Sequence, residues 1–279
     1  MNNPPSKQHY LPAVYLKQFS VDGSDGRRRS KIWRLDRNIC QLVTVEDQCR
    51  ERFYNSEAEP AKAEKLFQNY ENLYAQLACK IWAGEEAGSA HNYFGLIAFM
   101  LSLHFRNPSY KNLTKDERIV VYVNLEGEFL LQILGVVVDP NHPSREHLEM
   151  FTKCWGVRLM RAIEDFLVTS DNPAQIFHQE GIPRLITLPI TPQCCAVAFD
   201  RRAFASVWSQ ELSKQDIERL NRLQVHSCVN ALFSAAQQTT EDVQMVRGVW
   251  TKRNPPPGFV SDEDWRSNYR GIEPFEFLA

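Results

Sequence analysis

The sequence predicts an α+β fold in which several long helices pack on an antiparallel sheet of short strands. The predicted order of elements is a helix, a hairpin, a run of helices, a strand meander and a last helix. Such separate runs of helices and strands are typical of α+β proteins. No internal repeat or low-complexity linker interrupts them. We therefore expect a single domain over residues 1–253.

The first predicted elements are a short helix and a hairpin. Pro12 suits the start of a helix that we expect to reach Phe19, and this places His9 just before the helix. Residues 31–36 and 39–45 then predict two strands around a turn at Arg37-Asn38.

The centre of the chain is predicted to be helical. Ser56 and Glu59 form a capping box that predicts a helix to about residue 83, with Glu71 on the flank of its apolar stripe. A second helix over residues 91–105 must end before Pro108, so Arg106 lies at its end. We expect two more helices, one starting near residue 114 and one over residues 144–153.

The last part of the domain predicts a strand meander and a helix. The strands are expected over residues 155–160, 166–169, 184–188 and 195–199, with a turn at residues 171–173. Ser213 predicts the N-cap of a helix whose apolar stripe continues to Leu232 and whose face includes Asn221. Residues 254–279 contain prolines and aromatic residues and predict an extended C-terminal arm that binds a protein partner.

Composition limits the class of protein. The 279 residues are 43% hydrophobic and carry a net charge of -2, which predicts a sizeable core and no global basic surface for nucleic acid. Seven cysteines without a Cys-x-x-Cys motif indicate reduced thiols. The longest apolar run, residues 129–138, is too short to span a bilayer, and no secretory signal opens the chain. We expect a cytoplasmic protein that does not enter a membrane.

Three polar clusters stand beside prolines at the ends of apolar elements. They are His9-Tyr10-Leu11-Pro12, Arg106-Asn107-Pro108 and Thr169-Ser170-Asp171-Asn172-Pro173. Proline stiffens the backbone, so such clusters suit a preorganised site.

Together with further matches, these clusters resemble a large, mostly bacterial domain family of unknown function. That family opens with His-Tyr-x-Pro and carries a central Thr-Ser-Asp-Asn-Pro. The further matches are Tyr15-Leu16, Phe19, Lys31-Ile32-Trp33, Phe53-Tyr54 and Leu188-Pro189-Ile190-Thr191-Pro192. The likeness extends from about residue 9 to residue 233. It implies no activity and no substrate.

The residues themselves suggest candidate catalytic roles. His9 has a side chain that titrates near neutrality and could act as a general acid or base, with Glu71 as a second acid. Asp171 with Asn172 could position a water molecule or a metal ion. No metal-binding motif is local in the sequence, so a divalent metal would need ligands brought together by the fold.

Two further residues are candidates for substrate binding. Arg106 could hold a phosphate or carboxylate group, and Asn221 lies in the apolar face of the last helix. Each candidate also has a structural interpretation. His9 could anchor the N-terminal segment, Asp171 could stabilise a turn, and Arg106 could pair with Glu71 or with Asp171 inside the protein.

Two functions follow from these interpretations. The first is a hydrolase or nuclease-like enzyme acting on an anionic, phosphate-containing substrate such as a nucleic acid or nucleotide. It predicts that His9, Glu71, Arg106 and Asp171 converge on one open pocket. The second is a non-enzymatic binding or interaction module in a bacterial stress or defence system. In that case the motifs serve folding, and binding uses the surface.

Overall fold

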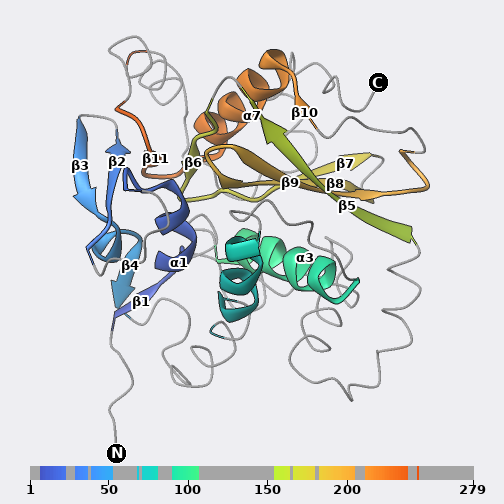
Figure 1. Cartoon of the computed structure of the whole chain (residues 1–279), viewed down its shortest axis with the longest axis horizontal. Helices are drawn as coiled ribbons and strands as arrows, with labels where there is room; N and C mark the ends of the chain where they lie inside the picture. The colour runs from blue at the N-terminus through green and yellow to red at the C-terminus, as the bar shows by residue number, and fades with distance from the viewer. Residues whose placement is uncertain are drawn as a thin grey trace, which may run out of the picture.

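The protein has an α+β fold, as the sequence predicts, with helices on both sides of its largest sheet (Figure 1). The computed structural model describes residues 7–22, 29–36, 39–52, 68, 71–80, 90–106, 154–163, 166–179, 182–204, 211–237 and 244. None of the helices in these ranges is long and apolar enough to cross a membrane.

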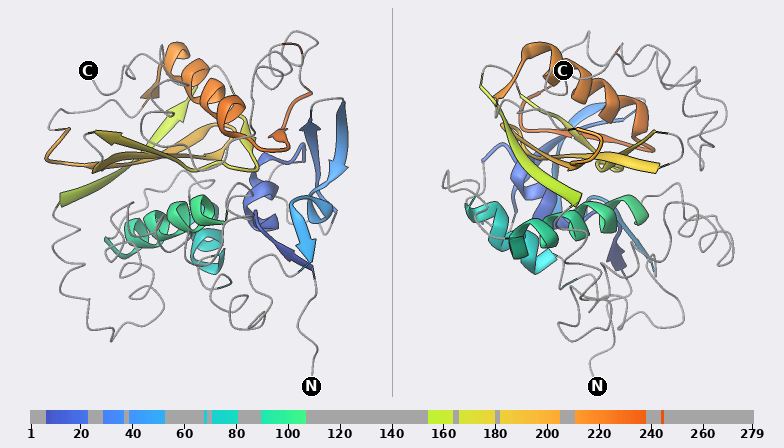
Figure 2. Two further views of the ribbon diagram at one scale, coloured as in Figure 1. Left: turned by 180° about the vertical axis from the view of Figure 1, so that it is seen from behind. Right: turned by 90° about the vertical axis from the view of Figure 1, so that its right-hand side faces the viewer.

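The largest sheet has five strands in the order β10, β5, β9, β8 and β7. Their bounds are Glu211–Leu212, Trp155–Ala162, Cys194–Asp200, Ile182–Thr191 and Gln175–Gln179. All neighbours are antiparallel except β10 and β5. Helix α3 (Ala90–Phe105) lies against one face and α7 (Lys214–Ser227) against the other (Figure 2).

Strand β9 lies in the middle of this sheet and is buried along its whole length. Its side chains alternate between the two faces, as in any strand. Val197 and Phe199 join the apolar cluster that contains α7, whereas Ala196 and Ala198 join the cluster that contains α3. Both faces of the sheet are therefore core, with α3 packed on one and α7 on the other.

Two smaller sheets complete the described part of the fold. One has the order β3, β2, β11 and β6, all antiparallel, with bounds Cys40–Thr44, Lys31–Leu35, Leu232–Ser234 and Thr169–Ser170. The other pairs β1 (Lys7–His9) with β4 (Arg50–Arg52). The predicted hairpin of residues 31–45 is thus confirmed as β2 and β3.

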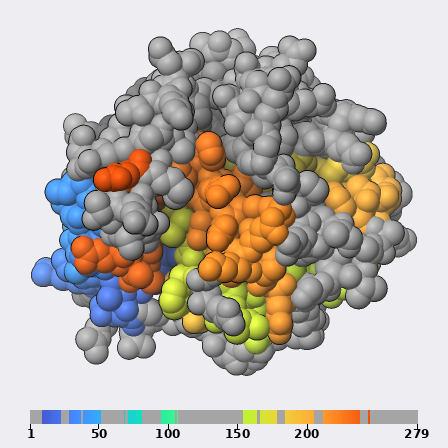
Figure 3. Space-filling model, turned by 90° about the horizontal axis from the view of Figure 1, so that it is seen from above, coloured from blue at the N-terminus to red at the C-terminus, as the bar shows by residue number. Residues whose placement is uncertain are grey.

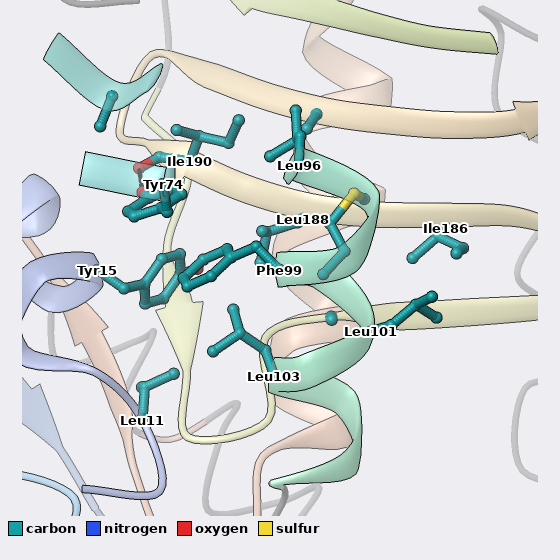
Figure 4. Close-up of a cluster of buried hydrophobic side chains, with 14 of the residues drawn as sticks. Leu11, Tyr15, Tyr74, Leu96, Phe99, Leu101, Leu103, Ile186, Leu188 and Ile190 are labelled. Carbon is teal, nitrogen blue, oxygen red and sulfur yellow. Dashed lines mark hydrogen bonds between the residues drawn. The ribbon is translucent and has the colours of Figure 1, made fainter. Parts of the chain in front are cut away.

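The N-terminal helix packs into the core between the sheets. Helix α1 (Ala13–Leu16) continues as the 3₁₀ helix η1 (Lys17–Phe19), as predicted, with Pro12 at its N-cap position. Tyr15 lies beside Tyr74 and Phe99, and the Tyr74 and Phe99 rings stack with centroids 4.1 Å apart (Figure 4). A second 3₁₀ helix, η2 (Val45–Asp47), follows β3.

The last helix is shorter than the sequence predicts. Ser213 caps it as expected, and its side chain accepts the Asp216 N–H at 3.1 Å. The helix ends at Ser227, however, and Leu232 lies in strand β11. An apolar stripe cannot distinguish a helical residue from a strand residue here, because Val225 of α7 and Leu232 of β11 pack in the same cluster. The prediction of a helix to residue 232 was wrong.

The strand predicted over residues 166–169 also differs from the observed one, because only Thr169 and Ser170 are paired, in β6. Strand β7 was not predicted. Helix α3 confirms the helix of residues 91–105, and residues 71–80 are helical within the one predicted to start at Ser56. The capping box itself, the helices predicted after residue 114 and over residues 144–153, and the arm of residues 254–279 lie outside the described residues.

Candidate functional site

The Asp171 carboxylate is buried and bonded to the backbone. Its Oδ1 accepts the Val229 N–H at 2.7 Å, and its Oδ2 accepts the Asn230 N–H at 2.8 Å. Burial raises the pKa of Asp171 to about 6, although these amide bonds act in the opposite direction. Only 2% of the residue is exposed. Asp171 therefore holds the connection between α7 and β11, and both its oxygens are occupied.

The residues around Asp171 bind the same helix. Ser170 donates to Gln224 Oε1 at 2.8 Å, and Gln224 in turn donates to the Pro173 carbonyl at 2.9 Å. Asn172 donates through Nδ2 to the Ser227 carbonyl at 3.1 Å. The Thr-Ser-Asp-Asn-Pro segment is thus fastened to the C-terminal half of α7, and Asn172 serves this contact.

Thr169 connects the same segment to the N-terminal helix. The Tyr15 hydroxyl donates to the Pro189 carbonyl at 2.7 Å and lies 2.6 Å from Thr169 Oγ1. A phenol has one hydrogen to donate, so Thr169 is the donor in its bond to Tyr15. Helix α1, β6 and β8 are therefore joined at one buried hydroxyl pair.

Asn221 bridges α7 to the chain before β6. Its Oδ1 accepts the Val168 N–H at 2.9 Å, and its Nδ2 donates to the Phe166 carbonyl at 3.0 Å. Its amide thus supplies the bonds that a neighbouring strand would supply, which explains why residues 166–168 need no strand partner. In this arrangement the Asn221 amide makes a structural contact between α7 and residues 166–168.

Arg106 joins three elements at the end of α3. It donates to Glu71 Oε1 at 3.0 Å and, through its other terminal nitrogen, to the His9 carbonyl. Arg106 is 4% exposed and Glu71 is 20% exposed. Of the two internal pairs considered from the sequence, the structure contains the pair with Glu71. His9, Glu71 and Arg106 therefore do lie together, but Arg106 contacts the backbone carbonyl of His9 and not its ring.

The His9 ring is turned toward η2. Its Nε2 lies 3.2 Å from the Glu46 carbonyl, which makes Nε2 the protonated nitrogen when the ring is neutral. Burial lowers the pKa of His9, and the positive charges of Arg50 and Arg106 lower it further. Nδ1 has no hydrogen-bond partner within the described residues and is not among their fully buried atoms. His9 is thus a neutral imidazole with one nitrogen open to a proton.

Sequence reasoning missed the buried thiol of Cys49, which lies close to the His9 segment. Cys49 has a left-handed backbone with φ of 54°, an unusual conformation for a residue with a side chain, and accepts the Tyr10 N–H at its carbonyl. Burial raises the pKa of Cys49, and the nearby negative charge of Asp171 adds to the rise. The thiol is therefore held protonated and is a poor nucleophile. The run of residues 45–52 carries no recognisable signal for this conformation.

A second ion cluster also escaped the sequence analysis. Asp200, at the end of β9, accepts bonds from Arg184 and from Arg202, the latter at 2.9 Å to each oxygen. Burial would raise the pKa of Asp200, but these bonds hold it below the usual value. The cluster links strands β8 and β9 at one end of the sheet.

Within the part of the chain that the structure describes, no three His, Cys, Asp or Glu side chains are grouped to hold a metal ion. The contacts define an α+β domain whose polar motifs join its helices to its sheets. Residues 7–238 match the family described as protein of unknown function (DUF4238), so the chain belongs to that family. The expected membership of a domain family of unknown function is thereby confirmed. No curated protein and no solved structure matches the chain.

Proposed function

We propose that this protein is a non-enzymatic interaction module, in which the polar motifs maintain the fold and binding uses the surface. The observation that carries the proposal is the state of the Asp171 carboxylate, whose two oxygens each accept a backbone N–H in the interior. With only 2% of the residue exposed, a carboxylate bonded in this way is directed at the backbone and not at a substrate or metal ion in solvent. Asn221, Glu71 and Arg106 are likewise engaged in contacts inside the domain. Asn172 donates through Nδ2 to the Ser227 carbonyl, while its buried Oδ1 has no hydrogen-bond partner within the described residues.

The exposed apolar side chains give such a module a surface for its partner. Ile39 and Leu42 in and beside β3 are 48% and 44% exposed, and Ile163 and Phe166 near the end of β5 are 65% and 55% exposed. Exposed apolar groups of this size are common sites of protein association when they are adjacent. All seven cysteines are unpaired thiols, which supports a reducing setting such as a bacterial cytoplasm. We include a role in bacterial stress or defence in this proposal.

The His9 ring favours a second candidate, a hydrolase acting on a phosphate-containing substrate. A neutral imidazole with an open Nδ1 suits a general base, and Arg50, which follows η2, could hold an anionic group beside it. Glu46 and Asp47 oppose this candidate, because their carboxylates lie close to Arg50 and Lys17 and would repel an anion. We therefore rank it second.

One set of assays separates the two candidates. The purified chain is incubated with phosphodiester, nucleotide and single-stranded nucleic-acid substrates, with and without divalent metal. The interaction module predicts the same background rate for the wild type, His9→Gln and the matched variant His226→Gln. Turnover that is lost in His9→Gln and kept in His226→Gln would overturn the proposal in favour of the hydrolase.

A further inference from the structure

We draw no further inference here: the strongest candidate, the buried side-chain cluster in which Asp171 lies close to Tyr10 and Cys49 beside the connection between α7 and β11, would be a pH-sensitive latch only on the basis of the pKa of Asp171, since its contacts belong to the site already described.

Discussion

Arg106 at the end of α3 donates to Glu71 Oε1 at 3.0 Å, although 35 residues separate them in the chain. The same arginine donates to the His9 carbonyl and thereby fixes the end of β1. Two residues that the sequence presents as parts of a substrate site thus neutralise each other inside the protein. Helix α7 packs on the face of the sheet opposite α3, and Figure 3 shows this helix from above, in orange, at the surface of the molecule.

We expect Arg106→Ala to destabilise the protein strongly, by about 3 kcal/mol, because it leaves the partly buried Glu71 carboxylate without its partner. Glu71→Gln should cost less, and the double variant should cost less than the sum of the two. Urea denaturation of the wild type, the two single variants and the double variant gives the coupling free energy between the two side chains. Additive effects would show that the two side chains do not interact.

Replacing Asp171 by alanine removes the acceptor of two backbone N–H groups. We expect a loss of about 2 to 4 kcal/mol in the free energy of unfolding, because buried donors without partners are costly. Asp47→Ala, at a side chain 72% exposed, is the matched control and should change stability little. A small effect of Asp171→Ala would mean that Val229 and Asn230 find other acceptors.

The pH dependence of stability should report the buried carboxylate. Since the folded pKa of Asp171 is about 6, above its ordinary 3.8, its titration favours the folded state fully below pH 3.8. That contribution, about 3 kcal/mol, is lost as the pH rises through 6. Thermal unfolding of the wild type and Asp171→Asn from pH 4 to 8 measures this contribution as the difference in stability between the two proteins. Parallel curves would argue against a raised pKa.

His9 should show the opposite sign. Its folded pKa lies below its ordinary 6.5, so its contribution to stability is present above pH 6.5 and is lost as the pH falls through the folded pKa. An NMR titration of the ring should give a midpoint below 6.5. Arg50→Gln removes one positive neighbour and should move the midpoint up, whereas Arg158→Gln on the distant β5 should not. A midpoint unaffected by Arg50 would leave burial and the charge of Arg106 as the causes of the lowered pKa.

Two glycines should respond to alanine in opposite directions. A Cβ at Gly156 would lie 2.5 Å from the ring of Phe199 on the neighbouring strand, so Gly156→Ala should destabilise by about 1 to 3 kcal/mol. At Gly95, in α3, a Cβ would meet Leu73 at an ordinary 3.6 Å, and alanine should stabilise by about 0.5 to 1 kcal/mol. Calorimetric melting temperatures compare the two. A tolerated Gly156→Ala would indicate that Phe199 moves aside.

The local elements with strong signals could be predicted from the sequence alone. The hairpin of β2 and β3, the cap of α7 at Ser213 and the span of α3 follow from alternation, capping and helical periodicity over neighbouring residues. The expected membership of a domain family of unknown function is confirmed by the family match over residues 7–238. Each of these depends on residues close together in the chain.

The contacts of the polar residues, in contrast, depend on the tertiary structure. Asp171 and Val229 are 58 residues apart, and the bond between them holds the chain directly after α7 ends. A carboxylate near a proline suits both a catalytic loop and a purely structural turn. The sequence does not distinguish these two roles. The distinction depends on which donors the fold brings to its oxygens. Here those donors are backbone amides, because the connection after α7 passes directly over the buried Asp171 side chain.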